Sequence, residues 1–458
     1  MARNRHATHP TIPLITPADP TFETLRACFV KRDSEIPAAI ARPQTATDVQ
    51  VLIKYCTKHH VDFIVRCGGH DCTGRSQKNG SLSIDLRDIR HVTLSEDEKA
   101  AVIGGGILLR DLAEALDERG LITPVGSVAS VGYVGWATLG GYGPFSLKYG
   151  LGVDQITGAK LVNAKGELIE AGADLLQGIR GGGGNFGVIV ELTIKVYPLK
   201  ELLTSLIIYE SSNPYTAWTN YAMGYERLKA SQPLPPALQL QPFAIELPGR
   251  GKVLAVSATW ASPNQEEGKA WFDRIAGLGT CVVNRPEAKS VRAYASFNEA
   301  LVVYGSYGRS FTLSVKRYTP KTVALLAKYT DLLPGGSIAI SAHTYWPGVP
   351  GTGTTPVTAP ATASVFRNRE PHLMLEFVAV TPAPELGEKG AEWASDLMRE
   401  LREQDPENVL EGGYISLMAD GETDIRSVYG VHYDTLMALK RKYDPDNVFR
   451  NAVPRLEI

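Results

Sequence analysis

Hydrophobic and polar residues recur with two different periods along this chain. From Val188 to Tyr197 apolar and polar side chains alternate, which predicts a strand with one buried face. From Pro43 to His60 apolar residues recur every three or four positions, which predicts a helix, with Thr47 and Gln50 as a capping box. Shorter patterns predict strands at 61–65, 82–86 and 100–103, a helix at 107–118 closed by Gly120, a hairpin at 157–170 and a short helix at 174–179.

The pattern changes beyond Pro198, where clusters of glycine stop. Strands are predicted at 237–247, 253–260, 310–318, 337–346 and 372–381, and helices at 215–230 and 387–404. This mixture predicts an α+β unit around an antiparallel sheet. The uncharged Pro/Gly/Thr segment 347–363 is expected to be a loop that lines an entrance, and a last helix is predicted at 429–441.

Composition narrows the class of protein. A length of 458 residues predicts two or three domains, and 44% apolar with 21% charged residues is typical of a globular protein. The formal charge of −2 gives no basic surface for nucleic acid, and no apolar run is long enough to span a membrane. The N-terminus lacks the apolar core of a secretory signal, so we expect an intracellular protein. Five cysteines without zinc-type spacing predict free thiols and no metal site.

The chemistry is expected around the loop that follows the strand predicted at 61–65. It reads Arg66-Cys67-Gly68-Gly69-His70-Asp71, and its two glycines allow backbone N–H groups to approach an anionic group closely. The histidine directly after them is a nucleophile. The alternative interpretation is a turn with an unrelated histidine.

Two further glycine-rich segments precede residue 200. Residues 124–152 carry one charged side chain, Lys148, together with several large apolar ones, which favours packing against a flat ligand over a free linker. Residues 180–187 read RGGGGNFG. A third cluster, Gly104-Gly105-Gly106, resembles the start of a dinucleotide-binding βαβ unit, but Leu109 replaces its third glycine. We therefore interpret that cluster as a turn between a strand and a helix.

Three motifs together resemble one known family. They are Arg66-x-Gly-Gly-His70, Ile179-Arg-Gly-Gly-Gly-Gly-Asn-Phe-Gly187 and Tyr443-Asp-Pro-Asp-Asn-Val-Phe-Arg450. Their order and spacing resemble the berberine bridge enzyme-like branch of the vanillyl-alcohol oxidase and p-cresol methylhydroxylase flavoproteins. The resemblance implies an α+β fold in which a two-lobed FAD-binding domain, residues 1–204, is completed by residues 407–458. A substrate-binding domain on an antiparallel sheet, residues 205–406, is inserted between them.

The resemblance also implies how FAD is held. His70 matches the histidine that is joined covalently to the 8α carbon of the flavin, and the glycine-rich loops would line the pyrophosphate and the isoalloxazine ring. Many relatives have a second link through a cysteine, whose position here is Val128, so a single covalent link is expected. The implied cofactor-binding residues are Arg66, Cys67, Gly68, Gly69, His70, Asp71, Val125, Gly126, Ser130, Val131, Gly132, Gly135, Thr138, Gly140, Gly141, Tyr142, Gly187, Val188, Ile189 and Asn451.

Candidate catalytic residues follow from the same resemblance. Val131 falls where the family controls the access of oxygen to the flavin, and valine there resembles the oxidases. Tyr142 matches a tyrosine that helps to deprotonate the substrate, although an aromatic side chain packed on a glycine turn is an equal alternative. His343 and Glu376, on two predicted strands, are further candidate bases, and for both a residue satisfied at the sheet surface is the competing interpretation.

Other positions depart from the family pattern. A tyrosine and an asparagine of plant relatives align with Val428 and His432, and the polar residues of an active-site strand align with Leu375 and Phe377. Secreted relatives form a disulfide at places that resemble Cys28 and Cys56; without a signal segment, we expect reduced thiols or leave the pairing open.

The sequence thus predicts an FAD-dependent oxidase that accepts hydride from an alcohol or other activated C–H donor and is reoxidised by O2 to give H2O2. Its partners would be a small molecule and O2, in a monomer or loose dimer without nucleic acid or membrane. Three alternatives stay open: a flavin dehydrogenase with another acceptor, a non-redox cyclase that retains FAD, and a flavin-binding protein without catalysis.

Overall fold

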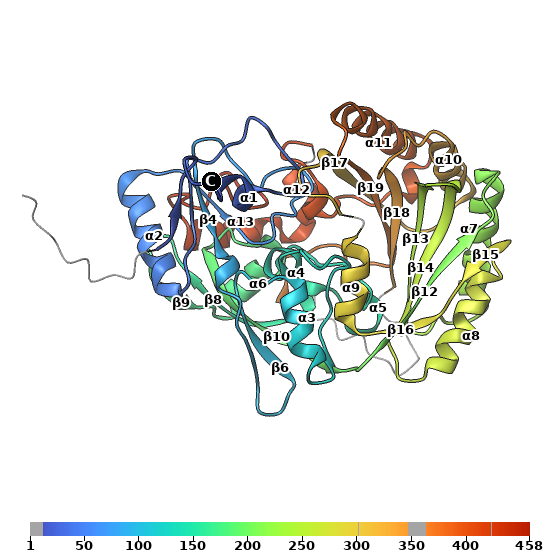
Figure 1. The fold of residues 1–458 in the computed structure, drawn as a ribbon, viewed down its shortest axis with the longest axis horizontal. Helices are drawn as coiled ribbons and strands as arrows, with labels where there is room; N and C mark the ends of the chain where they lie inside the picture. The colour runs from blue at the N-terminus through green and yellow to red at the C-terminus, as the bar shows by residue number, and fades with distance from the viewer. Residues whose placement is uncertain (1–11, 301, 347–362, 423) are drawn as a thin grey trace, which may run out of the picture.

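The fold is that of a computed structural model, and the structure describes residues 12–300, 302–346, 363–422 and 424–458. It contains helices and mostly antiparallel sheets, so the expected α+β class is confirmed. The sheets near the N-terminus occupy one side of Figure 1, and one large sheet with its helices occupies the other. The segment 347–362, predicted as an entrance loop together with residue 363, lies outside the described residues.

A small sheet carries the loop that contains His70. Three of its four strands, β2, β4 and β3, run parallel, and the edge strand β1 runs antiparallel to β2. Helix α2 (Ala46–His59) is capped by Thr45, whose side chain accepts a hydrogen bond from the backbone N–H of Asp48. The capping box therefore lies two residues before the predicted one. The strands, in hydrogen-bonded order, are β1 (Leu14–Ile15), β2 (Ala39–Ala41), β4 (Leu82–Asp85) and β3 (Phe63–Arg66).

A second sheet of five antiparallel strands packs below the first. Its central strand β10 corresponds to the clearest alternating pattern of the sequence and is paired on both sides. The strands, in hydrogen-bonded order, are β5 (Val92–Leu94), β6 (Ala100–Gly104), β10 (Val188–Lys195), β8 (Ile156–Val162) and β9 (Leu168–Glu170), and the short pair β7 (Leu121–Ile122) and β11 (Tyr197–Pro198) lies beside it.

The largest sheet forms the second half of the molecule. The predicted domain boundary at 204/205 falls inside its strand β12, which pairs with β14 along most of its length. Its strands are β15 (Cys281–Asn284), β12 (Leu202–Tyr209), β14 (Gly251–Trp260), β13 (Leu238–Leu247), β18 (Ala339–Tyr345), β19 (His372–Thr381) and β17 (Tyr307–Val315), with β16 (Glu287–Lys289) paired to β12.

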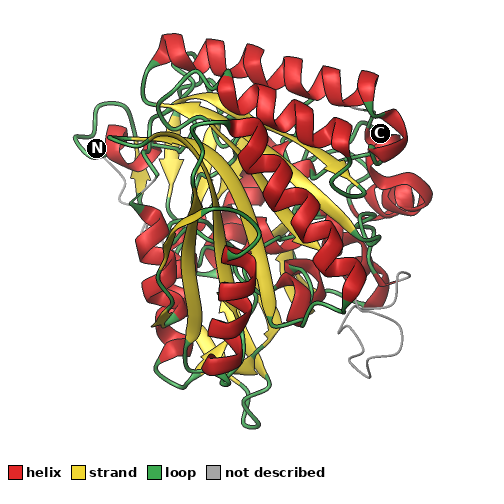
Figure 2. Cartoon of the chain, turned by 90° about the vertical axis from the view of Figure 1, so that its right-hand side faces the viewer, coloured by secondary structure: helices red, strands yellow, loops and turns green. Residues whose placement is uncertain are grey.

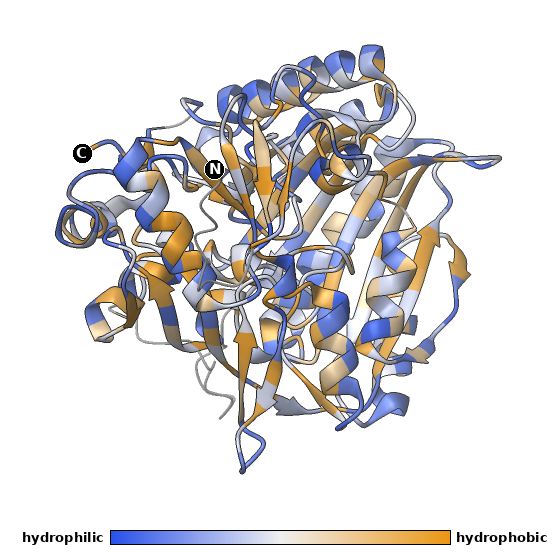
Figure 3. Ribbon diagram, turned by 60° about the vertical axis from the view of Figure 1, so that its left-hand side comes forward, coloured by the Kyte–Doolittle hydropathy of each residue, from blue (hydrophilic) through white to orange (hydrophobic). Residues whose placement is uncertain are grey.

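Helices cover one face of this large sheet, as Figure 2 shows. The covered face carries the apolar residues of the alternating strands, for example Leu375 and Phe377, both fully buried. Figure 3 shows apolar segments gathered along the strands, while the helices alternate between polar and apolar stretches. The covering helices are α7 (Pro214–Ser231), α8 (Gln265–Ala276), α10 (Pro320–Asp331) and α11 (Pro384–Gln404).

Two later segments return to the N-terminal half. Helix α9 packs against α3 and contributes Val291, Tyr294 and Ala295 to the core of that half (Figure 1). Helix α13 packs against α6. The helices outside the large sheet are α1 (Phe22–Arg26), α2 (Ala46–His59), α3 (Leu109–Asp117), α4 (Tyr133–Thr138), α5 (Ser146–Tyr149), α6 (Ala173–Gly182), α9 (Val291–Glu299), α12 (Ile425–Tyr429) and α13 (Tyr433–Tyr443).

Candidate FAD site

The loop after β3 is anchored by the buried guanidinium of Arg66. Its Nη1 donates to the backbone carbonyl of Leu25 at 2.8 Å, and Nη2 donates to that of Ala27. Its Nε has no partner among the described residues. A Cβ on Gly68 would lie 2.4 Å from the carbonyl oxygen of Ser130, so only glycine allows the two loops this close approach.

The backbone N–H groups of this loop are available to a ligand. Gly69, His70, Asp71 and Cys72 donate no backbone hydrogen bond to another described residue. A run of unpaired N–H groups is rare in a folded interior and is typical of loops that cradle an anion. The carboxylate of Asp71 fixes the loop by accepting from Arg75, 2.8 Å away. Burial raises the pKa of Asp71, but the Arg75 guanidinium outweighs this and holds it below the ordinary value.

His70 lies in a small aromatic enclosure. Its ring stacks on Phe29 and meets the edge of Tyr304, each with centroids 5.2 Å away. Its Nε2 is 2.7 Å from the Ser130 Oγ. Burial and the nearby Arg66 cation lower the pKa of His70 to about 4, so the imidazole is neutral near pH 7. A neutral imidazole keeps one nitrogen lone pair for bond formation.

Residues 130–132 of the glycine-rich segment predicted at 124–152 lie against the His70 loop. A Cβ on Gly132 would contact Cys67 Sγ at 2.6 Å, and the carbonyl of Val131 accepts from Leu109. Among the other predicted cofactor residues of this segment, Val125 is buried and Gly126 lies beside Trp136. Gly135 and Thr138 belong to α4, and Gly140 and Gly141 have positive φ.

The remaining predicted cofactor residues lie on neighbouring elements. Gly187 directly precedes β10. Val188 and Ile189 begin that strand, where the carbonyl of Ile189 lies against Gly105. The side chain of Asn451 donates to the carbonyl of Phe63 at 2.8 Å, so it holds the start of β3 and not the loop at its end.

Gly181, Gly182 and Gly183, expected to line FAD, pack closely against other parts of the protein. A Cβ on Gly181 would lie 2.6 Å from the backbone nitrogen of Phe366, and one on Gly182 would meet Leu436 at 2.9 Å. Gly183 meets the carbonyl of Val453 at 2.9 Å. These glycines therefore allow α6 to pack closely against other parts of the protein.

A cluster of aromatic residues surrounds Tyr142. Tyr345 and Tyr414 meet its ring with centroids 6.0 and 5.0 Å away, and Cys72, two residues after His70, packs against the same cluster. The Tyr142 Oη lies 2.8 Å from Nε2 of His372. Tyr142 is therefore both packed near the glycine turn and engaged through its hydroxyl, so the two interpretations of this residue are compatible.

The direction of the Tyr142–His372 hydrogen bond follows from the partner of the other ring nitrogen, Nδ1 of His372. His372 Nδ1 lies 2.6 Å from the carbonyl oxygen of Glu370, which only accepts, so Nδ1 carries the proton. Burial lowers the pKa of His372 to about 4, and the ring is neutral. Its Nε2 is then an acceptor, and the hydroxyl of Tyr142 donates to it.

Electrostatics keep Tyr142 protonated. Burial, followed by the neighbouring Tyr345 and Tyr414, raises the pKa of Tyr142 well above its ordinary value. Arg369 opposes this, and its guanidinium is itself held by Asp154 at 2.8 Å. The phenolate is thus disfavoured, and the residue acts through a neutral hydroxyl.

His343 and Glu376 lie side by side on the face of the large sheet that the helices do not cover. His343 Nε2 is 3.5 Å from Glu376 Oε2, and the amide of Gln241 donates to the same nitrogen at 3.2 Å. The polar active-site strand is therefore not lost at Leu375 and Phe377, because those two side chains point to the helix-covered face. The expectation that they replace active-site residues is wrong, since alternation places Glu376 on the other face.

Sequence reasoning missed several residues of the site. Tyr414 supplies a tyrosine next to Tyr142, whereas Val428, aligned with the family tyrosine, is buried under the Gly412 backbone. Glu299 accepts from Ser130 at 2.9 Å. His372 begins the strand predicted at 372–381, but no local pattern marked Glu299, because its partner is 169 residues away.

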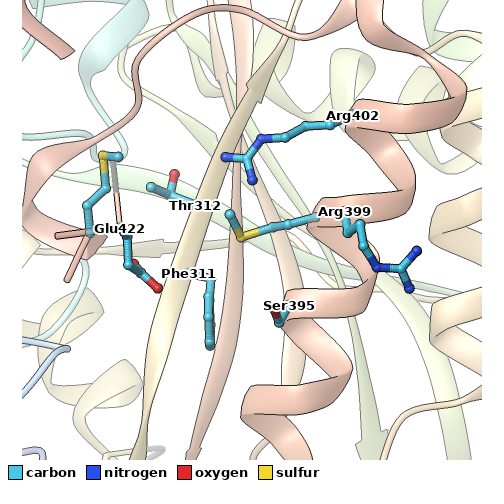
Figure 4. Close-up of a pocket in the computed structure, with 8 residues that line it drawn as sticks. Phe311, Thr312, Ser395, Arg399, Arg402 and Glu422 are labelled. Carbon is cyan, nitrogen blue, oxygen red and sulfur yellow. The ribbon is translucent and has the colours of Figure 1, made fainter. Parts of the chain in front are cut away.

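A cavity away from these residues lies at the edge strand β17. It has a volume of about 190 Å³, and Arg402 extends toward the strand while Arg399 turns away (Figure 4). None of its lining residues is a predicted site residue; they are Phe311, Thr312, Ser395, Met398, Arg399, Arg402, Met418 and Glu422. Cys28 and Cys56, which stand at places that resemble the disulfide of secreted relatives, are free thiols. No helix in the described part of the chain is long and apolar enough to cross a membrane.

Comparisons with known proteins identify the class. A family model described as FAD binding domain matches residues 37–172, and one described as berberine and berberine like matches residues 424–454. The FAD-linked oxidoreductase aurO of Gibberella zeae is 31% identical over 448 residues, covering 96% of this chain and 85% of that protein.

Solved structures show the same fold. 6-Hydroxy-D-nicotine oxidase from Arthrobacter nicotinovorans superposes with a TM-score of 0.82 at 24% identity, over 99% of this chain and 100% of that one. Glucooligosaccharide oxidase from Acremonium strictum, which carries 6-S-cysteinyl, 8α-N1-histidyl FAD, superposes with a TM-score of 0.78 at 18% identity, over 95% of each chain.

The fold and the matched domains define an FAD-binding oxidoreductase. The chain belongs to the FAD-linked oxidoreductases of the berberine bridge enzyme-like family, within the vanillyl-alcohol oxidase flavoproteins. The residues present fit FAD: the unpaired N–H groups after β3 suit an anionic pyrophosphate, and the orphaned Arg66 Nε adds a buried donor.

Proposed function

We propose that the chain is an oxidase that removes a hydride from an alcohol or other activated C–H donor, using FAD joined covalently to His70, with O2 as the final acceptor and H2O2 as a product. The observation that carries this proposal is the hydrogen bond from Tyr142 to the unprotonated Nε2 of His372. It gives the proton of a substrate hydroxyl a route away from the reacting carbon. FAD, when bound, supplies the acceptor for the hydride.

Tyr142 would take the substrate proton as its own proton passes to His372. A buried phenolate beside two other tyrosines is costly, and a concerted shift of two protons never forms one. The resulting imidazolium keeps its Nδ1–H bond to the carbonyl of Glu370, which stabilises a positive ring. The cation of Arg369 lowers the pKa of Tyr142 and so assists any partial negative charge on its oxygen.

A second route for the proton uses the His343–Glu376 pair. The ring centroid of His343 lies 6.3 Å from that of Tyr142, so a substrate bound beside both rings could contact either group. His343 and Glu376 form a polar patch with Ser341 and Gln241 on the sheet face that the helices do not cover. This patch suits a substrate with several hydroxyl or amide groups, and sugars and aromatic alcohols both belong to that class.

The proposed covalent link is single. Val128 stands where other relatives have the cysteine of the second link, and valine cannot form a bond to the flavin. The intact mass of the denatured wild-type chain is expected to exceed the polypeptide mass by one FAD, and His70→Ala is expected to lose all flavin on denaturation. Flavin that stays attached to His70→Ala would contradict the assignment.

The structure gives less support than the sequence did to a non-redox cyclase that retains FAD. It rested on the polar residues apparently lost at Leu375 and Phe377, and these side chains face the covering helices. The functional test is anaerobic mixing of the protein with a panel of sugars and aromatic alcohols while the flavin absorbance is recorded. Bleaching by one donor, followed by peroxide formation in air, is expected; a donor that is consumed without bleaching would favour the cyclase.

A further inference from the structure

A chain of hydrogen bonds leads from His70 to an acidic residue of α9, in the sequence segment between β16 and β17. His70 Nε2 lies 2.7 Å from Ser130 Oγ, and that oxygen lies 2.9 Å from Glu299 Oε2. The backbone N–H of Ser130 donates to the same carboxylate oxygen at 2.9 Å. Glu299 is the last residue of α9, which lies outside both family-model matches.

The directions of these bonds fix the tautomer of His70. A carboxylate only accepts, so the Ser130 hydroxyl donates to Glu299 and keeps its lone pairs for His70. The imidazole must therefore carry its proton on Nε2 and donate it to Ser130. The Nδ1 atom then holds the free lone pair, and it has no hydrogen-bond partner among the described residues.

The walls of the enclosure hold the ring in this orientation. Phe29 stacks on one face with an interplanar angle of 24°, and Tyr304 stands nearly perpendicular at 87°. The hydroxyl of Tyr304 donates to the carbonyl of Gly68 at 2.8 Å, so the aromatic wall is tied to the loop that carries His70. Rotation that exchanged the two ring nitrogens would break the bond to Ser130.

We propose that Glu299, acting through Ser130, orients His70 for attachment of FAD, with Nδ1 as the atom that forms the bond and Glu299 as the group that receives the proton. This inference rests on the covalent link of the proposed function and assigns its attacking atom and its positioning residues. Ser130 and Glu299 are positioning residues here, because His70 is the group that meets the cofactor.

The attachment balances with O2 as the oxidant. A C–N bond forms between Nδ1 and the 8α carbon of the flavin, and one C–H bond of that carbon breaks. The Nε2 proton of His70 passes to Ser130 as the hydroxyl proton of Ser130 passes to Glu299. The two electrons released reduce O2. H2O2 forms with the proton of the broken C–H bond and the proton that Glu299 then releases, so Glu299 returns to the carboxylate. Without Glu299 the proton has no acceptor in this chain of bonds.

One consequence links the two halves of the molecule. Glu299 belongs to the segment between β16 and β17, whereas His70 and Ser130 belong to the N-terminal half. Covalent attachment would therefore require α9 to be docked against α3, which is where the structure places it. The rate of attachment becomes a measure of that docking.

The test is the rate at which full-length protein, purified from riboflavin-limited cells, gains one FAD in intact-mass spectra after FAD and air are added. We expect Glu299→Gln and Ser130→Ala to slow the reaction ~100-fold, the usual scale of a lost proton acceptor, and Glu299→Asp to recover much of the rate. Glu266→Gln, at a carboxylate with 83% exposure of the side chain, is the matched control and is expected to react like wild type.

Two further measurements separate the possible failures. Non-covalent FAD binding, followed by flavin fluorescence before denaturation, is expected to be unchanged in Glu299→Gln, which excludes misfolding as the cause. NMR of the isolated flavin peptide is expected to show attachment at Nδ1. Attachment at Nε2, or a wild-type rate in Glu299→Gln, would overturn the inference alone, whereas a wild-type chain that never gains covalent FAD would overturn the proposed link as well.

Discussion

The behaviour of Tyr142 is set by a backbone carbonyl that it does not touch. The carbonyl of Glu370 takes the Nδ1 proton of His372, which leaves Nε2 as an acceptor for the tyrosine hydroxyl. The oxygen of Tyr142 therefore keeps its lone pairs for a third partner, which we take to be the substrate. This direction is fixed because His372 is fully buried and exchanges its partners with no solvent.

If Tyr142 and His372 move protons as a unit, the rate reductions caused by substituting each residue should not add in the double variant. We expect Tyr142→Phe and His372→Gln each to slow anaerobic flavin reduction by ~100-fold, because glutamine accepts the hydrogen bond but takes no proton. The double variant is expected to be no slower than Tyr142→Phe. The rates come from stopped-flow absorbance with a saturating donor. Losses that multiply in the double variant would show two independent roles.

The burial of His372 also makes stability depend on pH. Its pKa falls from 6.5 to about 4 on folding, so the unfolded chain binds the proton first as the pH is lowered. The free energy of unfolding should therefore decrease between pH 6.5 and pH 4, by about 3 kcal/mol at most from this residue. Urea titrations at both ends of this range should show a smaller decrease for His372→Gln. His91→Gln, at a half-exposed histidine, is the control and should keep the wild-type decrease.

At the scale of elements, the C-terminal motif is held by one buried ion pair. Lys440 Nζ donates to Asp444 at 2.6 Å, and both side chains are fully buried. The same carboxylate accepts from the backbone N–H groups of Val448 and Phe449. The motif around Tyr443 to Arg450 therefore closes the end of α13 and pins the chain terminus to the N-terminal half.

Removing one partner of this pair should be costly. Lys440→Met leaves Asp444 charged and unpaired in the interior, and we expect a loss of about 3–5 kcal/mol in the free energy of unfolding. Lys442→Met breaks an exposed pair with Asp174 and is expected to cost less than about 1 kcal/mol. Denaturant titration of both variants makes the comparison, and equal losses would contradict the account.

The elements show what alternation can and cannot predict. Alternation predicted the strand that begins at Val188, and the structure ends it at Lys195, two residues before the predicted end. Alternation also defines two faces of a strand without saying which one the helices cover. Leu375 and Phe377, aligned with polar active-site residues of the family, lie on the helix-covered face. The capping box was misplaced for a similar reason: Thr45 with Asp48 and Thr47 with Gln50 have the same spacing, and only the backbone distinguishes them.

At the scale of the whole molecule, the site is assembled from segments that are remote in sequence. His70 and its loop could be predicted, since a strand followed by two glycines and a nucleophile is a local pattern. Tyr142 meets a histidine 230 residues away, and Ser130 meets Glu299 across 169 residues. Such pairs depend on how the large sheet packs against the first two sheets. The periodicity of apolar residues within one segment does not predict that packing.

The access of oxygen is the property on which the assignment as an oxidase depends. Val131 lies next to the His70 loop, where its carbonyl accepts from Leu109, and its side chain is only half-buried. A leucine at this place adds one methylene to a confined space. We expect Val131→Leu to keep the rate of flavin reduction by a donor and to slow reoxidation by O2 at least ~10-fold, as followed by flavin absorbance.

The most direct test of the central claim is stopped-flow reoxidation of the chemically reduced protein by dissolved O2. An oxidase should recover the oxidised flavin spectrum much faster than free reduced flavin does, with Val131→Leu slower than wild type. Recovery of the wild-type spectrum no faster than that of free reduced flavin would contradict the claim and point to a dehydrogenase that uses another acceptor.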